Sequence, residues 1–188
     1  MSVRTRVAAV VLLTVGSLTV VTGVPAQAAH LTRPHATSKI SFPPVSGFRW
    51  VAAPSSISSL ATTLKATGLC SDAVVKGAAD KAGTVQDAAL IAQYNPAMTK
   101  LLDKATIKKI LDGAAKGAQA FAGSKAKASD HVANGAHFRV LSSSGIAVAV
   151  TYFRGGKLIE IFGPSLKQVT SFTSSFIKSA QARGAKTV

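Results

Sequence analysis

Apolar residues recur at every second position in the last third of the chain. The alternation occupies Phe138, Val140, Ile146, Val148, Val150 and Tyr152. A period of two predicts β-strands that turn one face towards a core. Residues 142–145 separate the first two strands, and Gly155 and Gly156 suit the positive φ angles of a hairpin turn. We therefore expect a three-stranded antiparallel meander over about residues 136–162.

A helical period follows the predicted strands. Ser165 and Gln168 have the spacing of a capping box. The apolar stripe that follows consists of Leu166, Val169, Phe172, Phe176, Ile177 and Ala180. A small sheet needs a cover for its apolar face. Residues 165–183 are therefore expected to form a helix that covers the meander.

Small residues dominate the chain between about residues 55 and 122, and their spacing favours helices. The expected helices occupy residues 56–67, 72–82, 85–93 and 96–121. Asn95 and Pro96 fit the cap and first position of the last of these helices, and residues 123–135 are expected to form a linker. The fold class predicted from these patterns is α+β. An Ala-rich helical N-terminal part precedes a three-stranded antiparallel meander, which a C-terminal helix covers.

The first 28 residues have the three parts of a secretory signal peptide. Arg4 and Arg6 precede an uncharged apolar run, and Ala26 and Ala28 provide the small side chains that precede a cleavage site. An uncleaved membrane anchor is the alternative interpretation. With cleavage after Ala28, no further transmembrane segment is expected. Residues 29–54 are then an extended Pro-containing arm, and residues 55–188 form a single α+β domain.

Positive charge dominates the expected mature chain. The complete chain has 22 Lys and Arg against seven Asp and Glu. Cleavage leaves 20 basic and seven acidic side chains, a net charge of +13. Such a charge attracts anionic partners. With an export signal, the expected location is extracellular or associated with the cell wall, as in small exported bacterial proteins. The expected partner is an anionic cell-envelope polymer or an acidic protein, whereas nucleic acid is disfavoured.

The sequence has little that indicates an active site. Cys70 is the single cysteine, and a buried thiol is favoured over a Cys–His dyad with His131 or His137. Glu160 alternates with apolar residues, which predicts partial burial beside a cation such as Arg154 or Lys157. The histidines lack the spacing and carboxylate neighbours of a zinc site. No cofactor or metal is therefore expected, and an enzyme is disfavoured but not excluded.

Basic residues give the remaining functional indication. The candidate anion-binding residues are Lys100, Lys104, Lys108, Arg154 and Lys157. The favoured hypothesis is a non-enzymatic exported protein that binds anionic polymers of the envelope or an acidic protein. A membrane-active or toxin-like domain that uses the basic helix 96–121 is the first alternative. A secreted hydrolase with an unrecognised site is the second.

Overall fold

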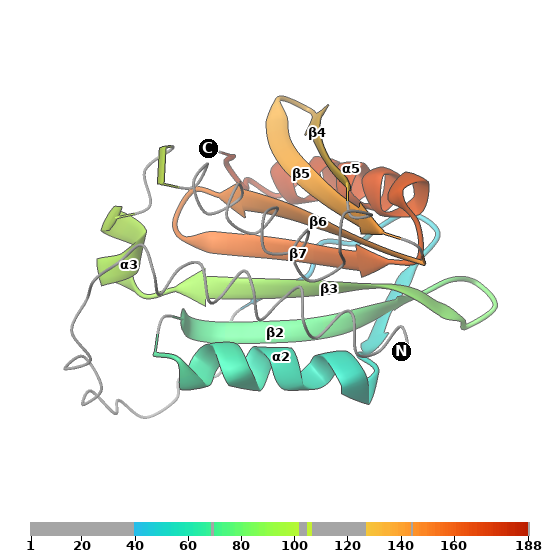
Figure 1. Cartoon of the computed structure of the whole chain (residues 1–188), viewed down its shortest axis with the longest axis horizontal. Coiled ribbons are helices and arrows are strands. Elements are labelled where there is room, and N and C mark those ends of the chain that lie inside the picture. Colours follow the sequence, from blue (N-terminus) through green and yellow to red (C-terminus); the bar gives the residue numbers. More distant parts are fainter. Residues whose placement is uncertain (1–39, 69, 102–104, 107–126, 144, 188) are drawn as a thin grey trace.

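A single antiparallel sheet forms the centre of the molecule in the computed structural model (Figure 1). The structure describes residues 40–68, 70–101, 105–106, 127–143 and 145–187. The seven strands are β1 (Arg49–Ala52), β2 (Cys70–Ala79), β3 (Val85–Tyr94), β4 (Lys127–Ala133), β5 (Ala136–Ser143), β6 (Ile146–Phe153) and β7 (Lys157–Gly163). Their order across the sheet is β1-β2-β3-β7-β6-β5-β4, and every neighbouring pair is antiparallel.

Helices lie on both faces of this sheet. Helix α2 (Ser55–Ala66) packs mainly against β2, and α5 (Leu166–Ala182) packs on the opposite face against β4 to β7. The short helix α3 (Pro96–Leu101) follows β3. Helix α5 begins as the sequence predicts, because the Oγ of Ser165 accepts a hydrogen bond from the backbone N–H of Gln168 at 3.3 Å. The sheet is therefore a middle layer.

Two hydrophobic clusters fill the spaces on either side of the sheet. The first joins Leu60 and Leu64 of α2 to the strand residues on that face, such as Leu90 and Val148. The second cluster joins the stripe of α5 to the other face and includes the N-terminal segment. Its largest members are Phe42, Ile91, Phe138, Phe153, Ile159, Ile161, Phe172, Phe176 and Ile177. Burial on both faces leaves the central strands with few polar positions.

The predicted fold class is wrong. The segments expected as helices over residues 72–82 and 85–93 form strands β2 and β3, and the expected linker contains strand β4. The predicted strands exist as β5, β6 and β7, but they belong to a seven-stranded sheet and do not stand alone. The molecule is mostly antiparallel sheet with helices on its two faces.

The error has a physical cause in the composition of β2 and β3. A strand that is covered on both faces is apolar at consecutive positions, so the period of two disappears. Alanine has a high helix propensity, but tertiary packing overrides propensity. A hydrogen bond and a glycine with a positive φ define the turn between these strands. The Asp80 backbone N–H donates to the Thr84 carbonyl at 3.0 Å, and Gly83 has a φ of +87°.

Several predictions fall on residues outside the described part of the chain. They include the signal peptide, residues 29–39 of the arm, most of the basic helix 96–121 and two candidate anion-binding residues, Lys104 and Lys108. Within the described residues, none of the helices is long and apolar enough to span a membrane.

Candidate anion-binding surface

The turn between β6 and β7 anchors the C-terminal segment of the chain. The backbone N–H of Arg154 donates to the carbonyl of Lys186 at 2.7 Å, and the Nε of Arg154 donates to the carbonyl of Thr187 at 3.1 Å. A β-bridge between Phe153 and Thr187 adds to this attachment. Residues 184–187 therefore have a fixed position beside the end of β6, although they form no helix or longer strand.

A second contact connects α5 to the turn between β4 and β5. Gln181 Nε2 donates to the carbonyl of Asn134 at 3.2 Å. Asn134 and Gly135 have φ angles of +48° and +75°, as in a two-residue type I′ turn between the paired residues Ala133 and Ala136. The Asn-Gly pair is a local signal for this hairpin, so the predicted linker over residues 123–135 is wrong at this point.

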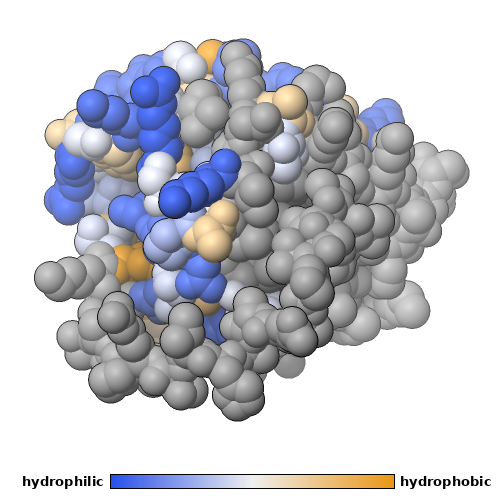
Figure 2. All heavy atoms as spheres, turned by 90° about the vertical axis from the view of Figure 1, so that its left-hand side faces the viewer, coloured by the Kyte–Doolittle hydropathy of each residue, from blue (hydrophilic) through white to orange (hydrophobic). Residues whose placement is uncertain are grey.

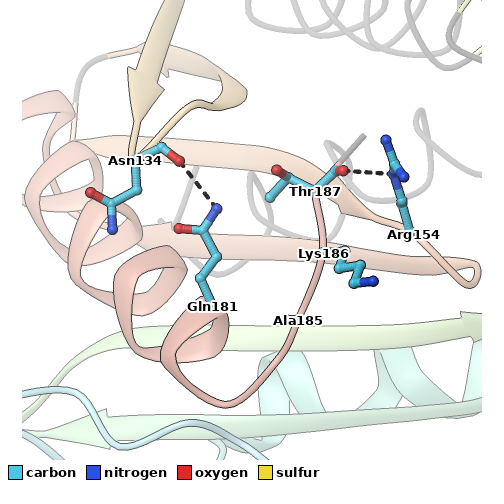
Figure 3. A pocket seen from close by; sticks show the side chains of 6 residues that line it. All are labelled: Asn134, Arg154, Gln181, Ala185, Lys186 and Thr187. Carbon is cyan, nitrogen blue, oxygen red and sulfur yellow. Dashed lines mark hydrogen bonds between the residues drawn. The ribbon is translucent and has the colours of Figure 1, made fainter.

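These two contacts border an open pocket of about 630 Å³ (Figure 3). In that view Arg154 and Lys186 lie on one side of Thr187, and Asn134 and Gln181 lie on the other. The residues that line the pocket are Asn134, Arg154, Gln181, Ala185, Lys186 and Thr187. Two of them carry a positive charge and none carries a negative charge. The pocket therefore offers hydrogen-bond donors and positive charge to an anion.

Two further cations lie close to this pocket. Lys157 and Arg183 line a neighbouring cavity, and both cavities share Ala185 in their walls. We call Arg154, Lys157, Arg183 and Lys186 the C-terminal basic patch. They come from the β6–β7 turn, the start of β7, the end of α5 and the C-terminal segment. Figure 2 faces this end of the molecule, where hydrophilic side chains cover much of the described surface.

The acidic residues of the described chain do not neutralise this patch. Asp130 binds Arg139 in an ion pair of 2.7 Å, Asp80 accepts hydrogen bonds within the β2–β3 turn, and Asp87 and Glu160 are each only 2 % exposed. Within the part of the chain that the structure describes, no carboxylate lies within 4 Å of a basic group of the patch. Asp72 lies at the same end of the sheet, two strands from Lys157, and its Oδ1 accepts a hydrogen bond from the backbone N–H of Ala73 at 2.8 Å. The four basic groups of the patch therefore outnumber the described carboxylates at this end.

The structure brings the predicted anion-binding residues together only in part. Arg154 and Lys157 both belong to the C-terminal basic patch. Lys100 lies in the last turn of α3. This helix lies beside the β6–β7 turn because the Tyr94 backbone N–H, just before α3, donates to the Gly156 carbonyl at 2.8 Å. Sequence reasoning missed the association of Arg183 and Lys186 with Arg154, because no local signal places the C-terminal segment against β6.

Alanine substitutions at two adjacent glycines test how the β6–β7 turn packs against its neighbours. Gly155 and Gly156 both have a φ of +84°. A Cβ on Gly155 would meet open space, whereas one on Gly156 would clash with Thr99 Oγ1 and lie 3.1 Å from Gln93 Nε2. Both alanine substitutions carry the strain of left-handed backbone, about 1–2 kcal/mol. Gly156→Ala should lose roughly 1–3 kcal/mol more through overpacking.

Chemical denaturation of the two variants measures this difference, and Gly155→Ala is the matched control for backbone strain. Equal losses of unfolding free energy would contradict the packing of α3 against the turn.

The geometry gives no support to thiol catalysis. Cys70 is buried, and burial followed by the charge of Glu160 raises its pKa to about 12, so the thiol stays protonated at neutral pH. His137 on β5 lies four strands away from Cys70 on β2, about 19 Å at the usual strand spacing. His131 lies one strand farther. A Cys–His dyad is therefore not formed.

Glu160 is only 2 % exposed, whereas the sequence predicts partial burial beside a cation. Its side chain lies on the α2 face of the sheet, with Leu90 and Val150 beside it on β3 and β6. Lys157 is three positions earlier on β7 and points to the opposite face. Arg154 binds the C-terminal carbonyl of Thr187 instead. The expected pairing of Glu160 with either cation is wrong.

No metal centre is found within the described residues, since they contain no cluster of three or more His, Cys, Asp or Glu side chains that could hold an ion. His131 instead stacks on Phe138, and its Nε2 lies 2.8 Å from the Oγ of Ser129.

Comparison with known proteins identifies no matching family, no matching curated protein and no matching solved structure.

Proposed function

We propose that this chain is a non-enzymatic exported protein whose C-terminal basic patch binds an anionic polymer of the cell envelope. The observation that carries the proposal is the convergence of four cations, none with a neighbouring carboxylate in the described structure. Arg183 and Lys186 belong to the segment 183–187, and Arg154 and Lys157 line the same two cavities as this segment. Several cations close together fit a ligand that repeats its own charge along a chain better than a single small ion.

The export signal supports the location of this proposed ligand. Residues 1–28 have the pattern of a secretory signal peptide, so the ligand would be met outside the cell. Polymers with repeated phosphates or carboxylates are the polyanions of that compartment. An acidic protein partner would meet the same charges, but it would need a shaped interface in addition.

Salt and charge substitution test the proposal. The probe is poly(glycerol phosphate), with neutral dextran as the control polymer. Binding should weaken steeply between low and high salt, because the Debye length falls from about 30 Å at 0.01 M to about 8 Å at 0.15 M. Arg154→Gln with Lys186→Gln should weaken binding roughly 5- to 30-fold, at about 0.5–1 kcal/mol for each charge.

The matched control is Lys81→Gln with Lys167→Gln. These exposed lysines lie at the opposite end of the sheet, in the β2–β3 turn and the first turn of α5 (Figure 1). The control changes the net charge by the same amount. Equal weakening in both double variants would show that only the overall charge matters, and salt-independent binding would remove the electrostatic basis of the proposal.

A further inference from the structure

The side chain of Asn134 is exposed in the turn between β4 and β5, directly before Gly135. The hydrogen bond from Gln181 reaches the backbone carbonyl of Asn134 and not its side chain (Figure 3). Among the described residues, the side-chain amide of Asn134 has no hydrogen-bond partner. This amide can therefore rotate towards the backbone nitrogen of the next residue.

An asparagine that precedes a glycine can lose its side-chain amide without an enzyme. The backbone nitrogen of Gly135 gives up its proton and attacks Cγ of Asn134, and the new N–C bond closes a succinimide ring. The bond from Cγ to Nδ2 breaks, and this nitrogen takes up a proton and leaves as ammonia. Water then opens the ring at either of its carbonyls, which leaves aspartate or isoaspartate at position 134.

The surroundings of Gly135 suit this reaction. Glycine has no Cβ that would obstruct the approach to its own nitrogen. Even a Cβ built on Gly135 would meet nothing within 4 Å, so the turn has open space for the ring.

The other asparagine of the chain is the opposite case. Pro96 follows Asn95, and proline has no N–H that could be lost before the attack. The Nδ2 of Asn95 also donates a hydrogen bond to the carbonyl of Gly68. Of the two asparagines in the sequence, only Asn134 can react through the following backbone nitrogen.

Deamidation at this position changes the charge of the pocket that contains part of the C-terminal basic patch. Asn134 lines this pocket together with Arg154 and Lys186, and none of the lining residues carries a negative charge. An aspartate carboxyl is ionised at neutral pH. A carboxylate at position 134 therefore adds a negative charge to the pocket wall, and it repels an anionic ligand that lies there.

We propose that Asn134 deamidates spontaneously in the folded protein, and that the new carboxylate weakens anion binding at the C-terminal basic patch. The second half of this inference rests on the proposed function, whereas the first concerns only the chemistry of the turn. Because the reaction consumes nothing but water, it proceeds with the age of each molecule. Older molecules therefore hold an anionic polymer less tightly than newly made ones.

Incubation of the mature chain followed by peptide mass spectrometry tests the first half. The peptide that contains Asn134 should change from the amide to the acid and appear in both aspartate and isoaspartate forms. The reaction should be faster at mildly alkaline than at mildly acidic pH, because the Gly135 nitrogen must lose its proton. The peptide that contains Asn95 is the internal control and should stay unchanged.

Two further samples make this result decisive. Asn134→Gln keeps an amide but would have to close a larger and less favourable ring, so it should stay unmodified. A synthetic peptide of residues 131–138 shows how fast the same sequence reacts without the fold. If Asn134 stays intact in the protein while this peptide converts, the folded turn prevents ring closure and the proposal is overturned.

Asn134→Asp tests the second half, because aspartate also suits a type I′ turn and supplies the new charge alone. At low salt it should weaken poly(glycerol phosphate) binding roughly 2- to 5-fold, as expected for one surface charge. Thr62→Glu is the matched control, since it adds the same charge at an exposed position of α2, on the other face of the sheet from α5. Far-UV circular dichroism and the melting temperature establish that each variant is folded.

The outcomes for the two proposals differ. Unchanged polymer binding by Asn134→Asp, or equal weakening by Asn134→Asp and Thr62→Glu, would overturn the second half of the inference and leave the polymer proposal intact. If the wild-type chain does not bind the polymer, the proposed function fails and takes the second half with it. The mass-spectrometric result still decides whether Asn134 reacts.

Discussion

Replacing Phe176 by alanine is expected to lower the unfolding free energy by about 3–5 kcal/mol. Phe176 is 1 % exposed and packs edge-on against Trp50, with ring centroids 6.2 Å apart. The substitution removes a buried aromatic ring and leaves a cavity between α5, the sheet and the N-terminal segment. Because a domain of this size has only roughly 5–15 kcal/mol of stability in total, the loss is a large fraction of it.

Thermal unfolding measures this effect, and the expected fall in melting temperature is roughly 6–20 °C for a chain of this length. Lys167→Ala is the control on the same helix. Lys167 is exposed in the first turn of α5, so its replacement should change stability by no more than about 0.5 kcal/mol. Similar losses for Phe176→Ala and Lys167→Ala would mean that α5 is not docked on the sheet through its Phe172 and Phe176 face.

Gly163→Ala is expected to lower the unfolding free energy by roughly 1–3 kcal/mol through overpacking alone. Gly163 ends β7, and a Cβ there would clash with Asp87 Oδ1 and lie 2.7 Å from Val169 Cγ2. Asp87 has little freedom to move. Its Oδ2 accepts a hydrogen bond from Gln168 Nε2 at 2.9 Å, and burial raises its pKa although this hydrogen bond acts in the opposite direction.

A double-mutant cycle separates the two contacts that a methyl group at Gly163 would make. In an Asp87→Ala background the nearest obstacle is gone, so Gly163→Ala should cost clearly less than in the wild-type chain. Urea denaturation of the four proteins gives the coupling between the two positions. A cost of Gly163→Ala that is the same in both backgrounds would show that Asp87 does not restrict this position.

The sequence predicted the elements whose signals are local. Helix α5 shows its cap at Ser165 and its apolar stripe, and strands β5 to β7 show alternation and glycine turns. The strands β2 and β3 could not be recognised in this way, because their burial on both faces removes alternation and their alanines favour a helix. Burial of this kind is a tertiary property, so it is absent from any short window of sequence.

The residues of the candidate site also differ in whether a local sequence signal indicates them. Arg154 and Lys157 could be chosen from the sequence because a hairpin turn displays them. Arg183 and Lys186 were visible only as basic residues near the end of the chain. Their place beside Arg154 depends on backbone hydrogen bonds between the β6–β7 turn and residues 186–187, and no sequence motif encodes such a contact.

The order of strands also determines how the chain must assemble. Strands β2 and β3 are joined by a short turn, and β4 to β7 follow one another through short turns, so each group can pair locally. The two groups meet only where β3 pairs with β7, and there Ile91 lies opposite Ile159, 68 positions later in the chain. Closing so long a loop costs more entropy than closing a hairpin, and non-local pairing of this kind slows folding. We therefore expect the pairing of β3 with β7 to be the slow step of folding. Until it occurs, each group exposes an unpaired strand edge on which a second, half-folded chain can pair.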